Sequence, residues 1–157
     1  MTLLRRVLLA VAALALAGGL TVASAVSAQA STHGGGCLSP RALYGDVSYA
    51  PCISITSDGR IAYDAYLGFF SPVPGLIKTC TVVENVRDDT VRNTIAQSTK
   101  DCTAAFRASA TNFHAGTFYR FQNGNGHAYH NYMWVYVEYQ SGYNYTTAVA
   151  NSPEQYT

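Results

Sequence analysis

Apolar and polar residues alternate along much of the chain after residue 50, which is the pattern of half-buried β-strands. Residues 52–56 alternate in this way, Asp58-Gly59 supplies turn residues, and residues 61–70 are rich in aromatic and β-branched side chains. Asp-Gly between two such runs predicts a β-hairpin with a type I′ turn. Residues 71–75 contain two prolines and end the second strand, because proline lacks the amide that a central strand needs.

Further strands are expected beyond this hairpin. The pattern predicts strands over residues 77–86, 91–97 and 102–110, with a turn at 87–90. No window after the first thirty residues shows a sustained helical period with a cap, so we expect little helix. Short strands with turns about every ten residues predict an all-β fold, a single antiparallel β-sandwich of immunoglobulin-like type. A small barrel is the alternative closure.

The aromatic residues concentrate in one region, because 11 of the 19 lie between Phe113 and Tyr145. Residues 123–126, Asn-Gly-Asn-Gly, predict a hairpin tip. Symmetric pairing about Asn125 would place Phe118 opposite Tyr132, Gly116 opposite Trp134, His114 opposite Tyr136 and Arg120 opposite His130. The more aliphatic face of this hairpin is the predicted core face; it contains Phe113, Ala115, Thr117, Phe121, Tyr129, Met133, Val135 and Val137.

The opposite face of the same hairpin is predicted to point outward as an aromatic strip. It consists of Phe118, Tyr132, Trp134 and Tyr136, edged by Arg120, His114, His130 and Glu138. Tyrosine and tryptophan stack on sugar rings or on a partner's apolar surface while a polar tip stays in water. Tyrosine-rich strands also arise simply because tyrosine is a good strand former, so the exposure of Trp134 decides between the two interpretations.

The first thirty residues have a different character. Arg5-Arg6 precede an apolar run from Val7 to Leu20, and Ala28-Gln29-Ala30 is a small-residue cleavage site. The run of 14 residues is shorter than the roughly 20 that span a bilayer. We therefore expect a cleaved signal peptide over residues 1–30 rather than a membrane anchor, and the apolar flanks of Arg5-Arg6 argue against a twin-arginine signal. The mature protein is then secreted and extracellular, with a flexible segment over 31–36 and one domain over 37–157.

Charge and cysteine content indicate which partners and which cross-links to expect in the mature chain. Without the leader, eight basic and nine acidic side chains remain, and no basic patch indicates nucleic acid. Four cysteines in an oxidising compartment predict two disulfides, for which three pairings are possible. We favour Cys37 with Cys52 and Cys80 with Cys102, because each pair brackets a short segment with turn signals. No close Cys-x-x-Cys pair indicates a zinc or redox site.

Candidate catalytic and metal-binding residues are few. Under the register above, His114 and His130 would lie about 20 Å apart, so only His127 and His130 could share a metal. Asp88-Asp89 lies at a predicted turn, where aspartate side chains hydrogen-bond their own backbone. The chain contains no Gly-x-Ser-x-Gly nucleophile elbow. We therefore expect no catalytic site, no metal and no cofactor.

These observations favour a non-catalytic protein that binds an extracellular glycan or protein through the aromatic strip. One alternative is an inhibitor of an extracellular hydrolase that presents residues 71–75 as a rigid proline loop. Another is a small extracellular enzyme, which would require a concave pocket with converging polar groups. The oligomeric state is left open.

Several short segments of the chain also carry a resemblance. They are Cys52-Ile53-Ser54-Ile55, Asp58-Gly59-Arg60, Tyr63-Asp64-Ala65-Tyr66, Cys80-Thr81-Val82-Val83, Asp88-Asp89-Thr90 and Cys102. In this arrangement the chain resembles small secreted proteins of actinobacteria over half of its mature length. The resemblance implies a disulfide-stapled β-sandwich and an extracellular location, and it carries over no functional residue.

Overall fold

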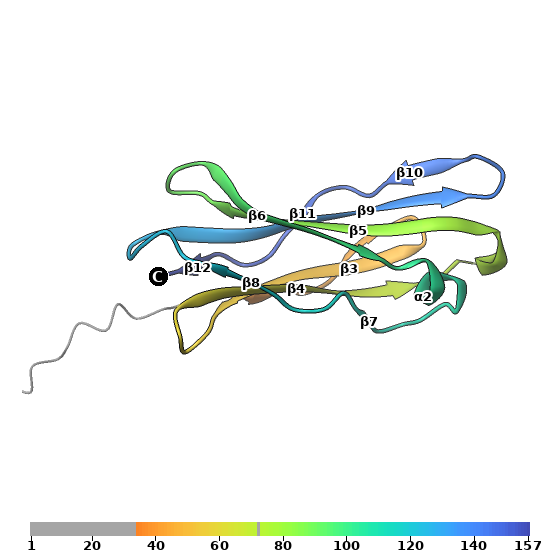
Figure 1. Cartoon of the computed structure of the whole chain (residues 1–157). Coiled ribbons are helices and arrows are strands. Elements are labelled where there is room, and N and C mark those ends of the chain that lie inside the picture. Colours follow the sequence, from red (N-terminus) through yellow and green to blue (C-terminus); the bar gives the residue numbers. More distant parts are fainter. Residues whose placement is uncertain (1–33, 72) are drawn as a thin grey trace, which may run out of the picture.

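Two antiparallel β-sheets packed face to face make up the structure, a computed structural model that describes residues 34–71 and 73–157 (Figure 1). The predicted signal peptide, residues 1–30, lies outside the described residues. The elements are β1 (Gly36–Cys37), β2 (Ala42–Tyr44), β3 (Val47–Ile55), β4 (Arg60–Phe69), the 3₁₀ turn η1 (Pro74–Leu76), β5 (Ile77–Asp88), β6 (Asn93–Asp101), α2 (Thr103–Arg107), β7 (Phe113–His114), β8 (Phe118–Phe121), β9 (Ala128–Tyr139), β10 (Asn144–Thr146), β11 (Ala150–Asn151) and β12 (Gln155–Tyr156). The all-β, two-layer architecture predicted from the sequence is confirmed.

Each sheet is built around a pair of long strands. In the β3–β4 sheet, β1 and β2 pair with β3, and β7 and β8 pair with β4. In the β5–β9 sheet, β6 pairs with β5, and β10, β11 and β12 pair with successive parts of β9. The outer side of the β5–β9 sheet, the upper layer in Figure 1, has no described element lying across it.

The predicted β3–β4 hairpin is confirmed, although its turn differs from the expected one. Ile55 pairs with Ile61, and the amide of Gly59 donates to the carbonyl of Thr56 at 2.9 Å. Gly59 has a φ of +77°, whereas Asp58 is not among the residues with positive φ. A type I′ turn needs positive φ at both central residues, so the chain forms a longer loop with one left-handed glycine instead.

The expected strand over residues 102–110 is wrong, because Thr103–Arg107 form the helix α2. The carboxylate of Asp101 accepts the amide of Thr103 at 2.8 Å, and the alanines that follow have high helix propensity. Phe106 is fully buried and stacks on Phe69 with ring centroids 4.6 Å apart. A helix of five residues is too short to show a helical period in the sequence. The packing of its own residue Phe106 into the core holds this helix in place.

The predicted hairpin around Asn125 is also wrong. β8 pairs with β4 in one sheet and β9 pairs with β5 in the other, so the loop between them crosses from sheet to sheet. The C-terminal residue Thr157 holds this loop, because its backbone carbonyl accepts the amide of Gly126 at 2.7 Å and its hydroxyl donates to the carbonyl of Gly124 at 2.9 Å. The Asn-Gly-Asn-Gly sequence therefore serves a crossing loop rather than a tight turn.

The buried side chains between the sheets form two clusters. The larger contains Val47, Tyr49, Ala65, Leu67, Phe69, Ile77, Cys80, Val82, Cys102, Phe106, Ala115, Met133, Val135, Val137 and Ala150. The smaller contains Ile53, Ile61, Tyr63, Val86 and Tyr129. Burying this apolar area is the main source of stability in a sandwich of this size.

Both predicted disulfides, Cys37–Cys52 and Cys80–Cys102, are confirmed. Cys37 and Cys52 face each other across β1 and β3. Cys80 and Cys102 lie in the larger core cluster, where the disulfide fixes the start of α2 against β5. Two disulfides are typical of extracellular proteins.

The first described residues pair with the C-terminal segment of the chain. Gly34 bridges to Gln155, and the amide of Gly35 donates to the carbonyl of Glu154 at 2.7 Å, so the end of the expected flexible segment is hydrogen-bonded. Among residues 34–71 and 73–157, no helix has the length and apolar character needed to cross a membrane.

Candidate functional site

The side chains of β9 alternate strictly between the core and the outer face of the β5–β9 sheet. On the inner face, Tyr129, Met133, Val135 and Val137 are fully buried, together with Asn131. On the outer face, His130, Tyr132, Trp134, Tyr136 and Glu138 are half-buried. The predicted division of this strand into a core face and an outward face is confirmed.

Three aromatic side chains therefore follow one another along the outer face of β9. Tyr132, Trp134 and Tyr136, which we call the β9 strip, are spaced about 6.8 Å apart at 3.4 Å per residue. Each ring is partly exposed rather than enclosed. The strip lies near the middle of its sheet, with β5 on one side and β10 and β11 on the other.

The other residues predicted for the aromatic strip do not join it. Phe118 lies opposite Tyr63 on β4, stacks on that ring at 5.6 Å and packs against the smaller core cluster. Arg120 lies opposite Ile61, and His114 lies opposite Tyr66, both in the β3–β4 sheet. Their placement follows from the crossing loop, which sends β8 and β9 to different layers.

Polar side chains border the β9 strip on both sides. On β5, the cross-strand partners of Tyr132 and Tyr136 are Asn85 and Thr81, and Val83 lies beside Trp134. One strand further out, β6 contributes Gln97, Thr99 and Asp101. On the opposite side, Asn151 faces Tyr132 and Thr146 faces Tyr136. The surface thus combines aromatic faces with amide, hydroxyl and carboxylate groups.

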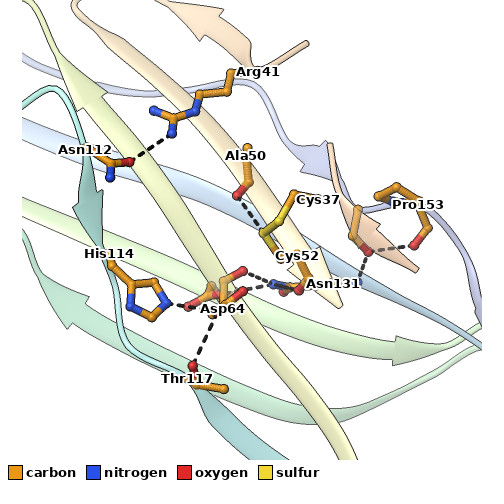
Figure 2. Close-up of a disulfide and its surroundings, with 12 residues drawn as sticks. Cys37, Arg41, Ala50, Cys52, Asp64, Asn112, His114, Thr117, Asn131 and Pro153 are labelled. Carbon is orange, nitrogen blue, oxygen red and sulfur yellow. Dashed lines mark hydrogen bonds and ion pairs between the residues drawn. A yellow bond between two sulfur atoms is a disulfide. The ribbon is translucent and has the colours of Figure 1, made fainter. Parts of the chain in front are cut away.

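A groove crosses the outer face of the β3–β4 sheet, on the opposite side of the molecule. It consists of two adjoining cavities of about 340 and 380 Å³, both lined by Tyr66 and Cys37. The first cavity is also lined by Asp64, Thr117, Gly36, Cys52, Ile53, Ser54 and Ala62, and the second by Arg41, Asn112, Leu38, Ser39 and Ala50. Figure 2 shows the Cys37–Cys52 disulfide between the two groups of polar side chains.

Asp64 is the charged group of the first cavity. Its Oδ2 atom lies 2.9 Å from His114 Nε2 and accepts a bond of 3.4 Å from the Thr117 hydroxyl (Figure 2). The His114 ring stacks on Tyr66 with centroids 4.6 Å apart. Asp64 and Tyr66 thus hold the His114 ring from two sides.

A buried polar pair lies between the two sheets, behind this groove. Asn131 Nδ2 is 2.8 Å from Glu84 Oε1 and 3.1 Å from the backbone carbonyls of Cys52 and Asp64. Glu84 is only 1 % exposed, and burial raises the pKa of its carboxyl to about 7. The amide of Asn131 thus connects β9 to the opposite sheet.

His114, His127 and His130 each contact an aspartate, and the sequence pattern predicted none of these pairs. The signal that sequence reasoning missed is the Asp88-Asp89 pair. Consecutive side chains near a strand end point to opposite faces, so Asp88 turns inward to His127 and Asp89 turns outward to His130. The predicted turn role is confirmed for Asp88, whose Oδ1 accepts the amides of Thr90 and Val91.

The second oxygen of the buried Asp88 contacts two further side chains. Oδ2 lies 2.6 Å from His127 Nδ1 and accepts 2.7 Å from Asn123 Nδ2. Burial alone would raise the pKa of Asp88, but these hydrogen bonds outweigh it and hold the pKa below its ordinary value. This network anchors the crossing loop to the end of β5.

Comparison of the chain with models of protein families, with curated proteins and with solved structures finds no match.

Proposed function

We propose that this chain is a secreted, non-catalytic β-sandwich protein that binds an extracellular glycan through the β9 strip. The observation that carries the proposal is the row formed by Tyr132, Trp134 and Tyr136, partly exposed on one face of the sheet. The secreted location is supported by the signal-like leader and by the two disulfides.

We also assign the sandwich to the immunoglobulin-like type, and the strand connections support this assignment. β4 and β5 lie in different sheets, and the chain later returns to both, with β8 beside β4 and β9 beside β5. Crossing connections of this kind, between two antiparallel sheets, are typical of immunoglobulin-like domains.

The chemistry of the strip suits a polysaccharide better than a compact ligand. Sugar rings have apolar faces that stack on aromatic side chains and hydroxyl edges that need hydrogen-bonding partners. Thr81, Thr146 and Asn151 offer both donors and acceptors beside the rings. Because the three rings follow one another along one strand and each is partly exposed, an extended chain can lie along β9.

Affinity gel electrophoresis tests the proposal with a panel of soluble polysaccharides, and sedimentation tests it with insoluble ones. The native protein should be retarded by at least one polysaccharide, and Trp134→Ala should weaken binding at least tenfold. Phe121→Ala is the matched control, because this ring is 74 % exposed but lies on β8 in the other sheet. If no polysaccharide binds, or if Trp134→Ala binds as well as the native protein, the proposal is wrong.

A second candidate function is binding of a protein, such as a hydrolase, at one end of the sandwich. Exposed apolar side chains gather there around the segment that contains the two prolines: Leu43, Tyr44, Phe70, Val73, Leu76 and Tyr143. Backbone hydrogen bonds link Phe70 to Asp46 and Gln140 to Leu76, which brings the three loops together. Substitution of Leu76 by aspartate would abolish binding of such a partner and leave glycan binding unchanged.

A further inference from the structure

Three side chains of types that commonly bind metals lie close together at one end of the β9 strip. They are Asp89, just after β5, His130 on β9, and Glu154, between β11 and β12. One ligand atom from each lies within 4.8 Å of the other two, and all three side chains are half-buried. Asp89 Oδ2 contacts His130 Nδ1 directly.

Neighbouring side chains fix the two carboxylates. Tyr132 donates its hydroxyl to Asp89 Oδ1 at 3.3 Å, and Arg87 Nε lies 3.2 Å from the same oxygen. The Tyr156 hydroxyl donates to Glu154 Oε2. In each carboxylate one oxygen is therefore held by an outer partner, which is how metal-ligating carboxylates are oriented in proteins.

Charge and ligand chemistry indicate what this cluster would bind. Asp89 and Glu154 are both acidic, and Arg87 lies beside Asp89 alone, so the cluster favours a cation. Imidazole nitrogen suits zinc, copper and nickel, whereas calcium and magnesium prefer all-oxygen sites. Three protein ligands leave one position of a tetrahedral ion open to water.

We propose that Asp89, His130 and Glu154 form a binding site for one divalent transition-metal ion, with Zn²⁺ as the best-matched common ion. The sequence alone indicates no such site, because Asp89 and Glu154 lie 41 and 24 positions from His130 and the predicted hairpin paired His130 with Arg120. Pairing of β5 and of the C-terminal segment with β9 brings the three ligands together.

The other two histidine–aspartate pairs serve as internal comparisons. His127 meets Asp88, whose two oxygens are occupied by the Thr90 and Val91 amides and by Asn123. His114 meets Asp64, and neither pair belongs to a group of three metal-ligating side chains among the described residues. Only the His130 pair has a second carboxylate within reach in the part of the chain that the structure describes.

The test is isothermal titration of the chelator-treated mature protein with Zn²⁺, without any glycan, so that it is independent of the proposed function. The native protein should bind one equivalent, and Glu154→Gln and His130→Ala should each weaken binding at least tenfold. His114→Ala, which removes a histidine from the other sheet, should bind as the native protein does. Co²⁺ should give the intense visible bands of a four-coordinate ion in the native protein and lose them in Glu154→Gln.

Two results would overturn this assignment. One is the absence of saturable binding at one equivalent of Zn²⁺. The other is binding that Glu154→Gln leaves unchanged, which would place the ion elsewhere. Circular dichroism of the metal-free Glu154→Gln variant checks that it is folded. Glu154 is only half-buried, so we expect this substitution to leave the fold intact. Titration with Ca²⁺ under the same conditions should give no saturation if the imidazole is a ligand.

Discussion

The side-chain amide of Asn131 donates a hydrogen bond of 2.8 Å to the carboxyl group of Glu84 in the interior between the two sheets. Both side chains are almost completely inaccessible to water. Asn131 Oδ1 has no hydrogen-bond partner among the described residues. Burial in this interior favours the neutral carboxylic acid of Glu84 over its carboxylate.

The stability of the protein should therefore depend on the ionisation of Glu84. Burial raises the pKa of Glu84 from 4.5 to about 7 in the folded state. Between these two values the folded state binds a proton that the unfolded state has lost, so the free energy of unfolding decreases as pH rises. The decrease from this group is about 3 kcal/mol and is complete above pH 7.

Urea unfolding of Glu84→Gln from pH 4.5 to 8.5 measures this contribution as the difference from the native protein. The variant should match the native protein near pH 4.5 and exceed its stability by up to about 3 kcal/mol at pH 8.5, because glutamine stays neutral. Glu138→Gln, on the surface beside Lys78, is the control and should show no such difference. A difference between Glu84→Gln and the native protein that does not change with pH would contradict the account.

Replacing Asn131 by alanine should destabilise the protein by about 3 kcal/mol or more. The variant loses its donor to Glu84 and to the carbonyls of Cys52 and Asp64, which stay buried. The cost should be larger at pH 8 than at pH 5, because the ionised Glu84 is then buried without its donor. A cost below about 1 kcal/mol at both pH values would show that the amide contributes little.

The two disulfides should differ in their accessibility to reductant. Cys37 is exposed, whereas Cys80 and Cys102 are 1 % and 0 % exposed. Mild reduction of the native protein followed by alkylation and peptide mapping should label Cys37 and Cys52 first. Cys80 and Cys102 should be labelled only after unfolding, because a thiolate must reach the sulfur atoms. Equal labelling of all four cysteines under native conditions would contradict the burial of Cys80–Cys102.

The outward face of β9 could be predicted from the sequence, because alternation within one strand determines which side chains share a face whatever the partner strand is. The predicted hairpin failed because the Asn-Gly-Asn-Gly segment is compatible both with a tight turn and with a loop that changes sheets. Only the long-range pairing of β9 with β5 decides between them, and local sequence does not encode it.

In the candidate site, too, the features within one strand could be predicted and those that depend on strand pairing could not. Tyr132, Trp134 and Tyr136 lie on one strand and were predicted together, whereas Phe118 and Arg120 were tied to them only by the wrong register. The meeting of Glu84 with Asn131 depends on the pairing of β5 with β9, and no turn or motif marks it. Chemistry within one element could thus be inferred from the sequence, and chemistry shared between elements required the fold.

Trp134 is the single tryptophan of the chain, so its fluorescence reports directly on the face that we propose binds a glycan. The most direct test is acrylamide quenching of this emission, with and without a saturating soluble polysaccharide identified by the gel assay. The account predicts that acrylamide quenches Trp134 in the free protein and that the bound polysaccharide protects it. Emission that is unquenched in the free protein, or equally quenched with the polysaccharide bound, would contradict it.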